Sequence, residues 1–101
     1  MTKADLVEQI TEAIGPGITK KDCAAVVDGL LNAVRRALAN GERIEIRGFG
    51  TFKVRHRKSR LARNPRTGEP VRVEARAVPV FKPSKSFRNQ VANQVEVSVD
   101  G

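Results

Sequence analysis

The sequence predicts an α+β fold, in which a base of two helices precedes a three-stranded antiparallel sheet and a short C-terminal helix. Three observations lead to this prediction. Apolar residues recur at helical spacing up to residue 39. After Gly41 that spacing is replaced by strict alternation of apolar with polar or charged residues. Between Lys53 and Arg66, seven Lys or Arg side chains occur without one Asp or Glu, which predicts that two strands extend beyond the sheet as a long cationic β-ribbon arm.

The length and the charge distribution predict one domain with a neutral half and an electropositive half. A chain of 101 residues corresponds to a single small domain, here residues 1–93, followed by a polar tail over 94–101. Residues 1–40 carry five basic and five acidic side chains, whereas residues 41–93 carry fourteen basic and four acidic ones. We therefore interpret the first half as a scaffold and the second half as a surface for a polyanion.

The first helix is predicted over residues 3–14. Thr2 and Asp5 have the spacing of a capping box, with Asp in place of the usual Glu or Gln. Gly15-Pro16-Gly17 ends the helix. The apolar residues that share one face are Leu6, Ile10, Ala13 and Ile14.

The second helix is predicted over residues 19–39, between the start signal of Thr19 and Asp22 and the stop at Asn40-Gly41. We expect Cys23 to be a buried small apolar residue rather than a reactive thiol. The apolar stripe of this helix is broader than the first helix alone could cover, which suggests a partner subunit, although a packed sheet would also serve. Its residues are Cys23, Val26, Val27, Leu30, Leu31, Val34 and Leu38.

Three strands and a last helix follow. Residues 43–47 and 51–55 alternate between apolar and charged side chains, and the third strand covers 71–81, with Pro79 indicating an edge position. The arm then covers about residues 55–76. Pro83-Ser84 opens the short helix, whose inner face we expect to carry Phe87 and Val91.

The arm is predicted to present its cations to phosphate groups. A basic run is often only a solvated segment, but this one is framed by strands of matching period and interrupted by the turn of residues 64–68. A β-ribbon fits a groove of duplex DNA, and the guanidinium of Arg suits a narrow groove. Pro65 at the tip is stiff and has no N–H, so it could wedge between base pairs, or it could only shape the turn.

The sequence offers little for catalysis. The single His, His56, lies within the basic run, and no Cys/His cluster has metal-ligand spacing, so we expect no enzyme, no metal and no cofactor. One Cys excludes an intrachain disulfide and is typical of a reducing cytosol, and neither a signal peptide nor a membrane span is expected. The closest acidic pairs are interpreted as solvated strand residues or as local partners for Arg: Glu42 with Glu45, and Glu69 with Glu74.

Three motifs resemble the bacterial HU and integration host factor family, and the resemblance covers nearly the whole chain. They are Gly48-Phe49-Gly50-Thr51-Phe52, the spaced cations Arg55, Arg57 and Arg60, and Ala62-Arg63-Asn64-Pro65-Arg66-Thr67-Gly68. Ala62 departs from the more usual glycine. Within the family, residues 41–50 are most similar to the integration host factor beta subunit.

The resemblance implies an intertwined dimer, of identical chains or of two paralogous subunits, whose two arms bend double-stranded DNA from the minor groove. It implies an architectural protein of the nucleoid in the cytoplasm, with no small-molecule substrate and no membrane partner. Pro65 would be the intercalating residue, and Glu45 and Arg47 would engage the groove outside the kink. The DNA-binding residues that it implies are Lys3, Glu45, Arg47, Lys53, Arg55, Arg57, Lys58, Arg60, Arg63, Asn64, Pro65, Arg66, Arg72, Arg76, Lys82, Ser84 and Lys85.

A ribosomal-type RNA-binding protein is the alternative, because a basic arm on a small domain also suits RNA. Proteins that bind single-stranded RNA usually stack its bases on aromatic side chains. Here all four Phe residues occupy core-like positions, and the chain has no Tyr or Trp. The sequence therefore favours duplex DNA.

Overall fold

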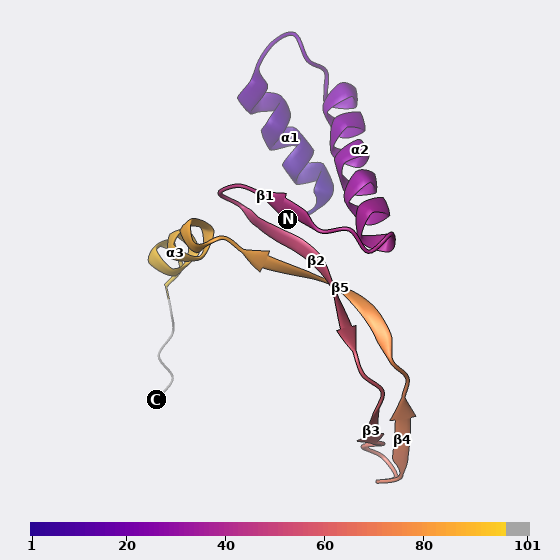
Figure 1. Cartoon of the computed structure of the whole chain (residues 1–101). Coiled ribbons are helices and arrows are strands. Elements are labelled where there is room, and N and C mark those ends of the chain that lie inside the picture. The colour runs from indigo at the N-terminus through magenta and orange to yellow at the C-terminus, as the bar shows by residue number, and fades with distance from the viewer. Residues whose placement is uncertain (97–101) are drawn as a thin grey trace. The chain divides into compact units, whose positions relative to one another are not determined.

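A computed structural model describes residues 1–96 and confirms the α+β fold (Figure 1). The chain divides into two compact units, residues 1–37 and the part from Leu38 onward. The last five residues of the predicted polar tail lie outside the described residues. The elements are α1 (Lys3–Ile14), α2 (Lys20–Ala39), β1 (Ile44–Ile46), β2 (Gly50–Arg57), β3 (Arg60–Arg63), β4 (Pro70–Val73), β5 (Arg76–Pro83) and α3 (Lys85–Gln94).

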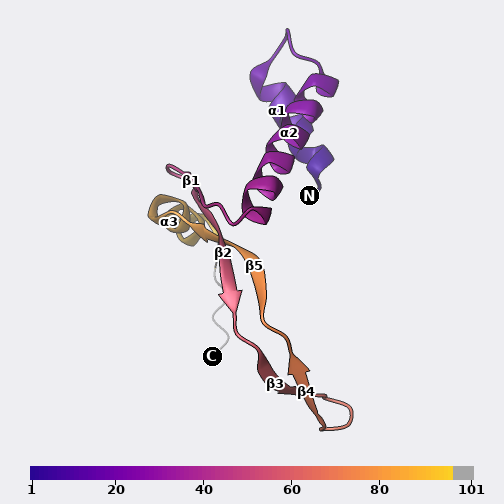
Figure 2. The same ribbon diagram turned by 45° about the vertical axis from the view of Figure 1, so that its right-hand side comes forward.

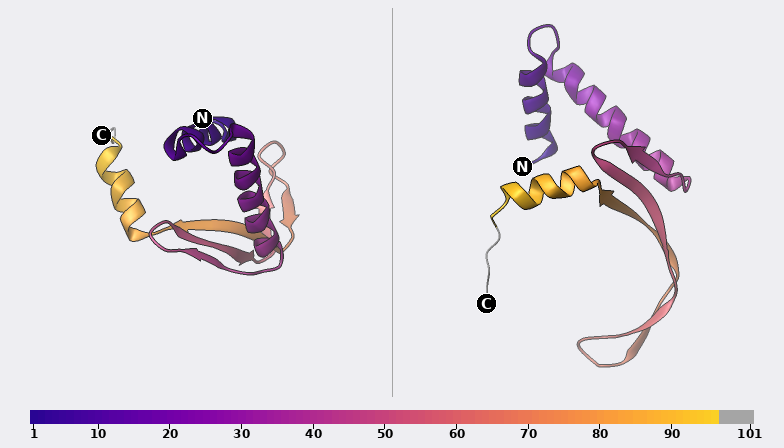
Figure 3. Two further views of the ribbon diagram at one scale, coloured as in Figure 1. Left: turned by 90° about the horizontal axis from the view of Figure 1, so that it is seen from above. Right: turned by 60° about the vertical axis from the view of Figure 1, so that its left-hand side comes forward.

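The first unit is a pair of helices, α1 and α2, joined by a short loop (Figures 1 and 3). At the start of α1, the backbone N–H of Thr2 donates to the carboxylate of Asp5 at 2.7 Å, and the Thr2 hydroxyl lies 3.1 Å from the same oxygen. These two hydrogen bonds hold the pKa of Asp5 below its usual value. Thr19 caps α2, because its hydroxyl oxygen accepts the N–H of Asp22 at 3.0 Å. Both predicted start signals are confirmed.

The core of this unit is small. Val7 and Cys23 are the buried apolar residues, with exposed fractions of 4% and 1%, and the prediction of a buried Cys23 is confirmed. On α1 the buried residue is Val7, which is not part of the predicted apolar face of Leu6, Ile10, Ala13 and Ile14. Much of the predicted apolar surface remains exposed to solvent: Leu6, Ile10, Ile14, Val26, Leu30 and Leu31.

The sheet of the second unit has the strand order β1–β2–β5, with antiparallel pairing throughout. The edge position of Pro79 on β5 is confirmed. Between β1 and β2 the chain turns at Arg47 and Gly48, where the N–H of Phe49 donates to the carbonyl of Ile46 at 3.0 Å. This turn brings the polar side chains of both strands to one face, since residues directly opposite in a ladder share a face.

Aromatic packing fixes α3 on the sheet. The rings of Phe49 and Phe87 are 5.1 Å apart, and those of Phe52 and Phe81 are 4.7 Å apart. Ser84 caps α3, because its hydroxyl oxygen accepts the N–H of Phe87 at 3.1 Å. The four Phe residues therefore form one cluster, but Phe49 and Phe81 remain exposed at 43% and 39%, so the predicted core-like positions are not buried in a single chain. Val91 on α3 also stays nearly half exposed.

The arm is built from β2 and β5, which continue into the separate two-stranded ladder of β3 and β4 (Figure 2). The sequence predicted two unbroken strands, but both lose regular pairing at residues 58–59 and 74–75. A ribbon of two strands that no helix covers twists strongly, which weakens its ladder locally. Figure 3 shows the resulting curve of the arm.

None of the helices within residues 1–96 combines the length and the apolar character that are needed to cross a membrane.

Candidate nucleic-acid interface

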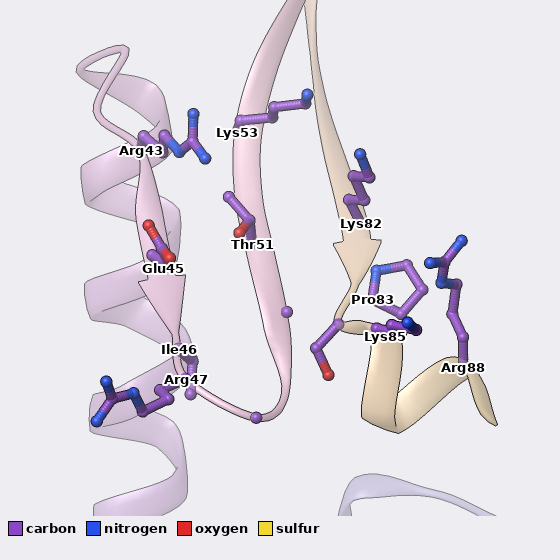
Figure 4. A pocket seen from close by; sticks show the side chains of 13 residues that line it. Arg43, Glu45, Ile46, Arg47, Thr51, Lys53, Lys82, Pro83, Lys85 and Arg88 are labelled. Atoms are coloured by element: carbon purple, nitrogen blue, oxygen red, sulfur yellow. The ribbon is translucent and has the colours of Figure 1, made fainter. Parts of the chain in front are cut away.

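A shallow pocket of about 410 Å³ lies on the polar face of the sheet (Figure 4). Its position follows from the strand register: Glu45 is opposite Thr51, and Thr51 is opposite Lys82. Because opposite residues share a face, these three side chains form one row across the sheet. Six cationic side chains from β1, β2, β5 and α3 and their connecting segments surround the row: Arg43, Arg47, Lys53, Lys82, Lys85 and Arg88.

The pocket collects six of the residues that the sequence assigned to DNA binding: Glu45, Arg47, Lys53, Lys82, Ser84 and Lys85. Arg43 and Arg88 were missed. Arg43 alternates with Glu45 and Arg47 in a strand, and Arg88 follows Lys85 at the i+3 spacing of a helix face, so both signals were present. Six cations and one carboxylate around one depression give this pocket a positive field that suits phosphate groups.

Ser84 has a structural role in the pocket besides the DNA contact that the sequence assigned to it. It uses its hydroxyl oxygen to cap α3, and its N–H donates to the carbonyl of Phe49 at 2.9 Å. Glu45 and Arg47 form no ion pair with each other in the described part of the chain.

The arm carries the densest charge. Its cations Arg55, Arg57, Lys58, Arg60, Arg63, Arg72 and Arg76 are all exposed. Within residues 1–96 the only ion pair of the arm joins Nε of Arg72 to Oε1 of Glu74 at 3.5 Å, and both side chains are more than two-thirds exposed. An ion pair so exposed contributes little to stability. The arm thus holds a surplus of positive charge that only an external anion can neutralise.

Backbone hydrogen bonds define the tip of the arm. The N–H of Asn64 donates to the carbonyl of Glu69 at 2.9 Å, and the N–H of Gly68 donates to the carbonyl of Asn64 at 2.7 Å. Gly68 has φ of 73°, a conformation that side chains disfavour. The side-chain oxygen of Asn64 accepts the N–H of Arg66 at 2.9 Å, so Asn64 shapes the turn. These contacts leave Pro65 and Arg66 exposed at the end of the ribbon.

Lys3 belongs to the first unit, apart from the sheet and the arm. Its Nζ lies 2.7 Å from Oδ1 of Asp28, and about half of each side chain is exposed. A phosphate group that contacts Lys3 would therefore compete with Asp28 for the ammonium group.

The remaining chemistry-bearing residues show no assembled catalytic or metal site. No group of three or more His, Cys, Asp or Glu residues within the described part of the chain could hold a metal ion. His56 is exposed between Arg55 and Arg57 on β2. Cys23 is a buried free thiol in the helical unit.

A small α+β domain with a cation-lined β-ribbon defines a nucleic-acid-binding protein. The family model described as "Bacterial DNA-binding protein" matches residues 1–92. Integration host factor subunit beta of Halorhodospira halophila is 48% identical over 91 residues, which is 90% of this chain and 88% of that protein. DNA-binding protein HU of Thermus thermophilus is 47% identical over 91 residues, which is 90% of this chain and 92% of that protein.

Solved structures agree with the sequence relatives. The chain matches HU in a cocrystal structure of Anabaena HU with DNA, with a TM-score of 0.81 and 38% identity over 91% of this chain and 98% of the other. The structure of HU from Thermotoga maritima matches with a TM-score of 0.63 and 30% identity, over 90% of this chain and 98% of the other.

The chain therefore belongs to the bacterial DNA-binding protein family of HU and integration host factor. Membership confirms the predicted family and the prediction of an architectural DNA-binding protein rather than an enzyme. It does not favour the ribosomal-type RNA binder. Relatives of both kinds, HU and the integration host factor subunits, have similar identities, so the comparisons do not separate the two subfamilies.

Proposed function

We propose that this protein bends double-stranded DNA as a dimer, with its arms in the minor groove and Pro65 intercalated between base pairs. The observation that carries the proposal is an exposed proline at the tip of a ribbon lined with unneutralised cations. Proteins that kink DNA from the minor groove insert apolar wedges of this kind between base pairs. Contacts with the flanking duplex offset the free energy that this unstacking costs. The cellular role that follows is organisation and compaction of the bacterial nucleoid in the cytoplasm.

The positions of the cations support wrapping of a bent duplex. The arm holds the duplex near the kink, and the pocket on the sheet offers Arg47, Lys53, Lys82 and Lys85 to a phosphate backbone nearer the body. Lys3 in the helical unit offers a further ammonium group to a phosphate. Arginine and lysine contacts with phosphates position the protein without reading sequence, so binding of most duplexes is expected.

The dimer is supported by the apolar surface that one chain leaves exposed. Val26, Leu30 and Leu31 on α2 are exposed by 68%, 58% and 38%, and Phe49 and Phe81 of the aromatic cluster by 43% and 39%. A soluble protein rarely leaves so many large apolar side chains exposed unless a partner covers them. A second identical chain or a paralogous subunit would fit the same surface.

The test compares an intact duplex, a nicked duplex of the same sequence and a single-stranded RNA at two salt concentrations. We expect the nicked duplex to bind most tightly, since its kink costs little, and we expect the RNA to bind weakly. Affinity for the duplexes should fall steeply as salt rises. Equal or tighter binding of the RNA would contradict the proposal.

A further inference from the structure

The two ladders of the arm share one register, which fixes the faces of the whole ribbon. Arg57 is opposite Arg76 in the first ladder, and Arg60 is opposite Val73 in the second. Two residues therefore separate the two pairs on each strand, so the interruption inserts no extra residue on either side. Because side chains alternate with a period of two, one face can be followed from the sheet to the tip.

Most of the charge lies on one of these two faces. One face, here called the cationic face, carries seven Lys or Arg side chains: Lys53, Arg55, Arg57, Arg63, Arg72, Arg76 and Lys82. The ion pair between Arg72 and Glu74 agrees with this assignment, since residues i and i+2 of a strand share a face. The opposite face carries His56 and Arg60, and its other paired residues are mostly apolar, among them Phe52, Val54, Ala62, Val71, Val73, Pro79 and Phe81.

Among the apolar residues of the cationic face, Val78 and Val80 are half-buried, whereas Leu61 is exposed. Leu61 lies opposite Arg72, two residues before Arg63, and its exposed fraction is 76%. With Ser59, Arg60 and Arg72 it borders a shallow depression of about 370 Å³. Val71 on the opposite face is less exposed, at 45%. An isolated exposed leucine is ordinary. This one, however, lies among cations, and their attraction to phosphates would bring it against the DNA.

We propose that Leu61 makes an apolar contact with the floor of the DNA groove, beside the deoxyribose and base edges, while Arg63 and Arg72 bind the flanking phosphates. The inference rests on the proposed function. It assigns to the arm a second apolar contact besides Pro65, one that adds affinity without neutralising a phosphate. An apolar contact depends little on ionic strength, whereas phosphate contacts release counterions and weaken as salt rises.

The experiment compares Leu61→Ser with Val71→Ser, which makes the equivalent change on the opposite face. Duplex affinity is measured by fluorescence anisotropy over a series of salt concentrations, on variants that circular dichroism shows to be folded. Leu61→Ser should weaken binding by roughly fivefold to tenfold at every salt concentration, and Val71→Ser by less than about twofold. The slope of log affinity against log salt should stay at the native value for both variants.

Three results would overturn the inference while the native protein still binds and bends duplex DNA. They are native affinity for Leu61→Ser, equal losses for the two variants, and a changed salt slope for Leu61→Ser, which would mean a lost phosphate contact. Sedimentation without DNA gives a further check. If the native protein forms larger assemblies than Leu61→Ser does, Leu61 contacts another copy of the chain and the inference is wrong. Failure of the native protein to bind any duplex would instead refute the proposed function itself.

Discussion

Gly50 shows how one residue determines the packing of the sheet under the arm. A Cβ at this position would lie 2.5 Å from the carbonyl oxygen of Lys82 and 2.6 Å from two ring atoms of Phe81. The carbonyl belongs to the backbone of β5, so it cannot move without disturbing the strand pairing. We expect Gly50→Ala to lower the free energy of unfolding by about 1–3 kcal/mol, measured by urea denaturation.

The matched control for Gly50→Ala is Gly29→Ala on α2. Nothing lies within 4 Å of a Cβ at Gly29, and alanine has the higher helix propensity. This variant should raise the free energy of unfolding by roughly 0.5–1 kcal/mol. Native stability for Gly50→Ala would show that the sheet relaxes around the added methyl group.

Pro65 is the residue on which the proposed bend depends. Pro65→Ala keeps the charge of the arm but removes the stiff apolar ring, so it should reduce DNA bending. Binding to an intact duplex should weaken more than binding to a nicked one, because a nick removes most of the unstacking cost of a few kcal/mol. Fluorescence energy transfer between the ends of a short duplex measures the bend, and an unchanged bend would leave Pro65 with a role in the turn only.

Arg47 and Glu45 bear on whether binding is sequence-neutral or site-selective. They border the cationic pocket on the sheet and form no ion pair with each other in the described residues, so the guanidinium of Arg47 is free to contact DNA. If the protein is site-selective, Arg47→Ala should weaken binding to a preferred site about tenfold more than binding to random duplexes. Equal losses on every duplex, measured in parallel titrations, would favour the sequence-neutral mode of binding.

At the scale of elements, the sequence predicted those features that depend on residues close together in the chain. Thr2 with Asp5 and Thr19 with Asp22 marked the helix starts because a cap is made within four residues. Pro79 marked an edge strand because it cannot donate to a neighbouring strand. The broken pairing at residues 58–59 was not predictable in the same way, since it reflects the twist of a ribbon that nothing covers.

The cationic pocket on the sheet shows the limit of sequence reasoning. Lys53, Lys82 and Lys85 were assigned to DNA one by one from the resemblance, whereas Arg43 and Arg88 were overlooked. Four elements contribute to this site, and only the register of β1, β2 and β5 shows which of their side chains meet. Alternation assigns a residue to a face of its own strand, but it does not assign partners across strands.

The arm as an element is expected to control the salt dependence of binding. Each phosphate contact contributes a slope of about −0.9 to log affinity against log salt. Arg60→Ala or Arg63→Ala should therefore flatten the slope by roughly one unit per arm, which is about two for a symmetric dimer. A titration at four salt concentrations measures this effect.

The control for the arm variants is Arg35→Ala. Arg35 lies on α2, where its guanidinium donates to the side-chain oxygen of Asn32 at 2.7 Å. Its removal changes the net charge equally, but it should leave the slope within about 0.3 of the native value. A native slope near zero would rule out wrapping of DNA by electrostatic contacts.

At the scale of the whole molecule, a single chain leaves much of its apolar surface exposed. Only Val7 and Cys23 are buried apolar residues in the described part of a 101-residue chain. The wide stripe on α2 predicted this surplus, and the structure shows that neither helix of the first unit covers Val26, Leu30 or Leu31. So small a core cannot offset the loss of chain entropy on folding, so folding and dimerisation should be coupled.

Because folding and dimerisation should be coupled, a substitution in the subunit interface is expected to lower stability and to dissociate the dimer. Leu30 is 58% exposed in a single chain, so Leu30→Asp places a charge in water there, but in the dimer it would bury a charge without a partner. We expect the dimer to lose on the order of 3–5 kcal/mol. Sedimentation should then show dissociation, with loss of helical circular dichroism at the concentration where the native chain is folded.

The matched variant separates a lost interface from a simple change in charge. Asn32 lies about 200° around α2 from Leu30, and Asn32→Asp adds the same negative charge there. Its carboxylate still accepts the hydrogen bond from Arg35, so this variant should remain a folded dimer with the native midpoint of thermal unfolding. A midpoint that rises with protein concentration in the native chain and in Asn32→Asp is the mass-action behaviour of a coupled dimer. A native chain that stays folded as a monomer at micromolar concentration would show instead that the exposed stripe of α2 is not a subunit interface.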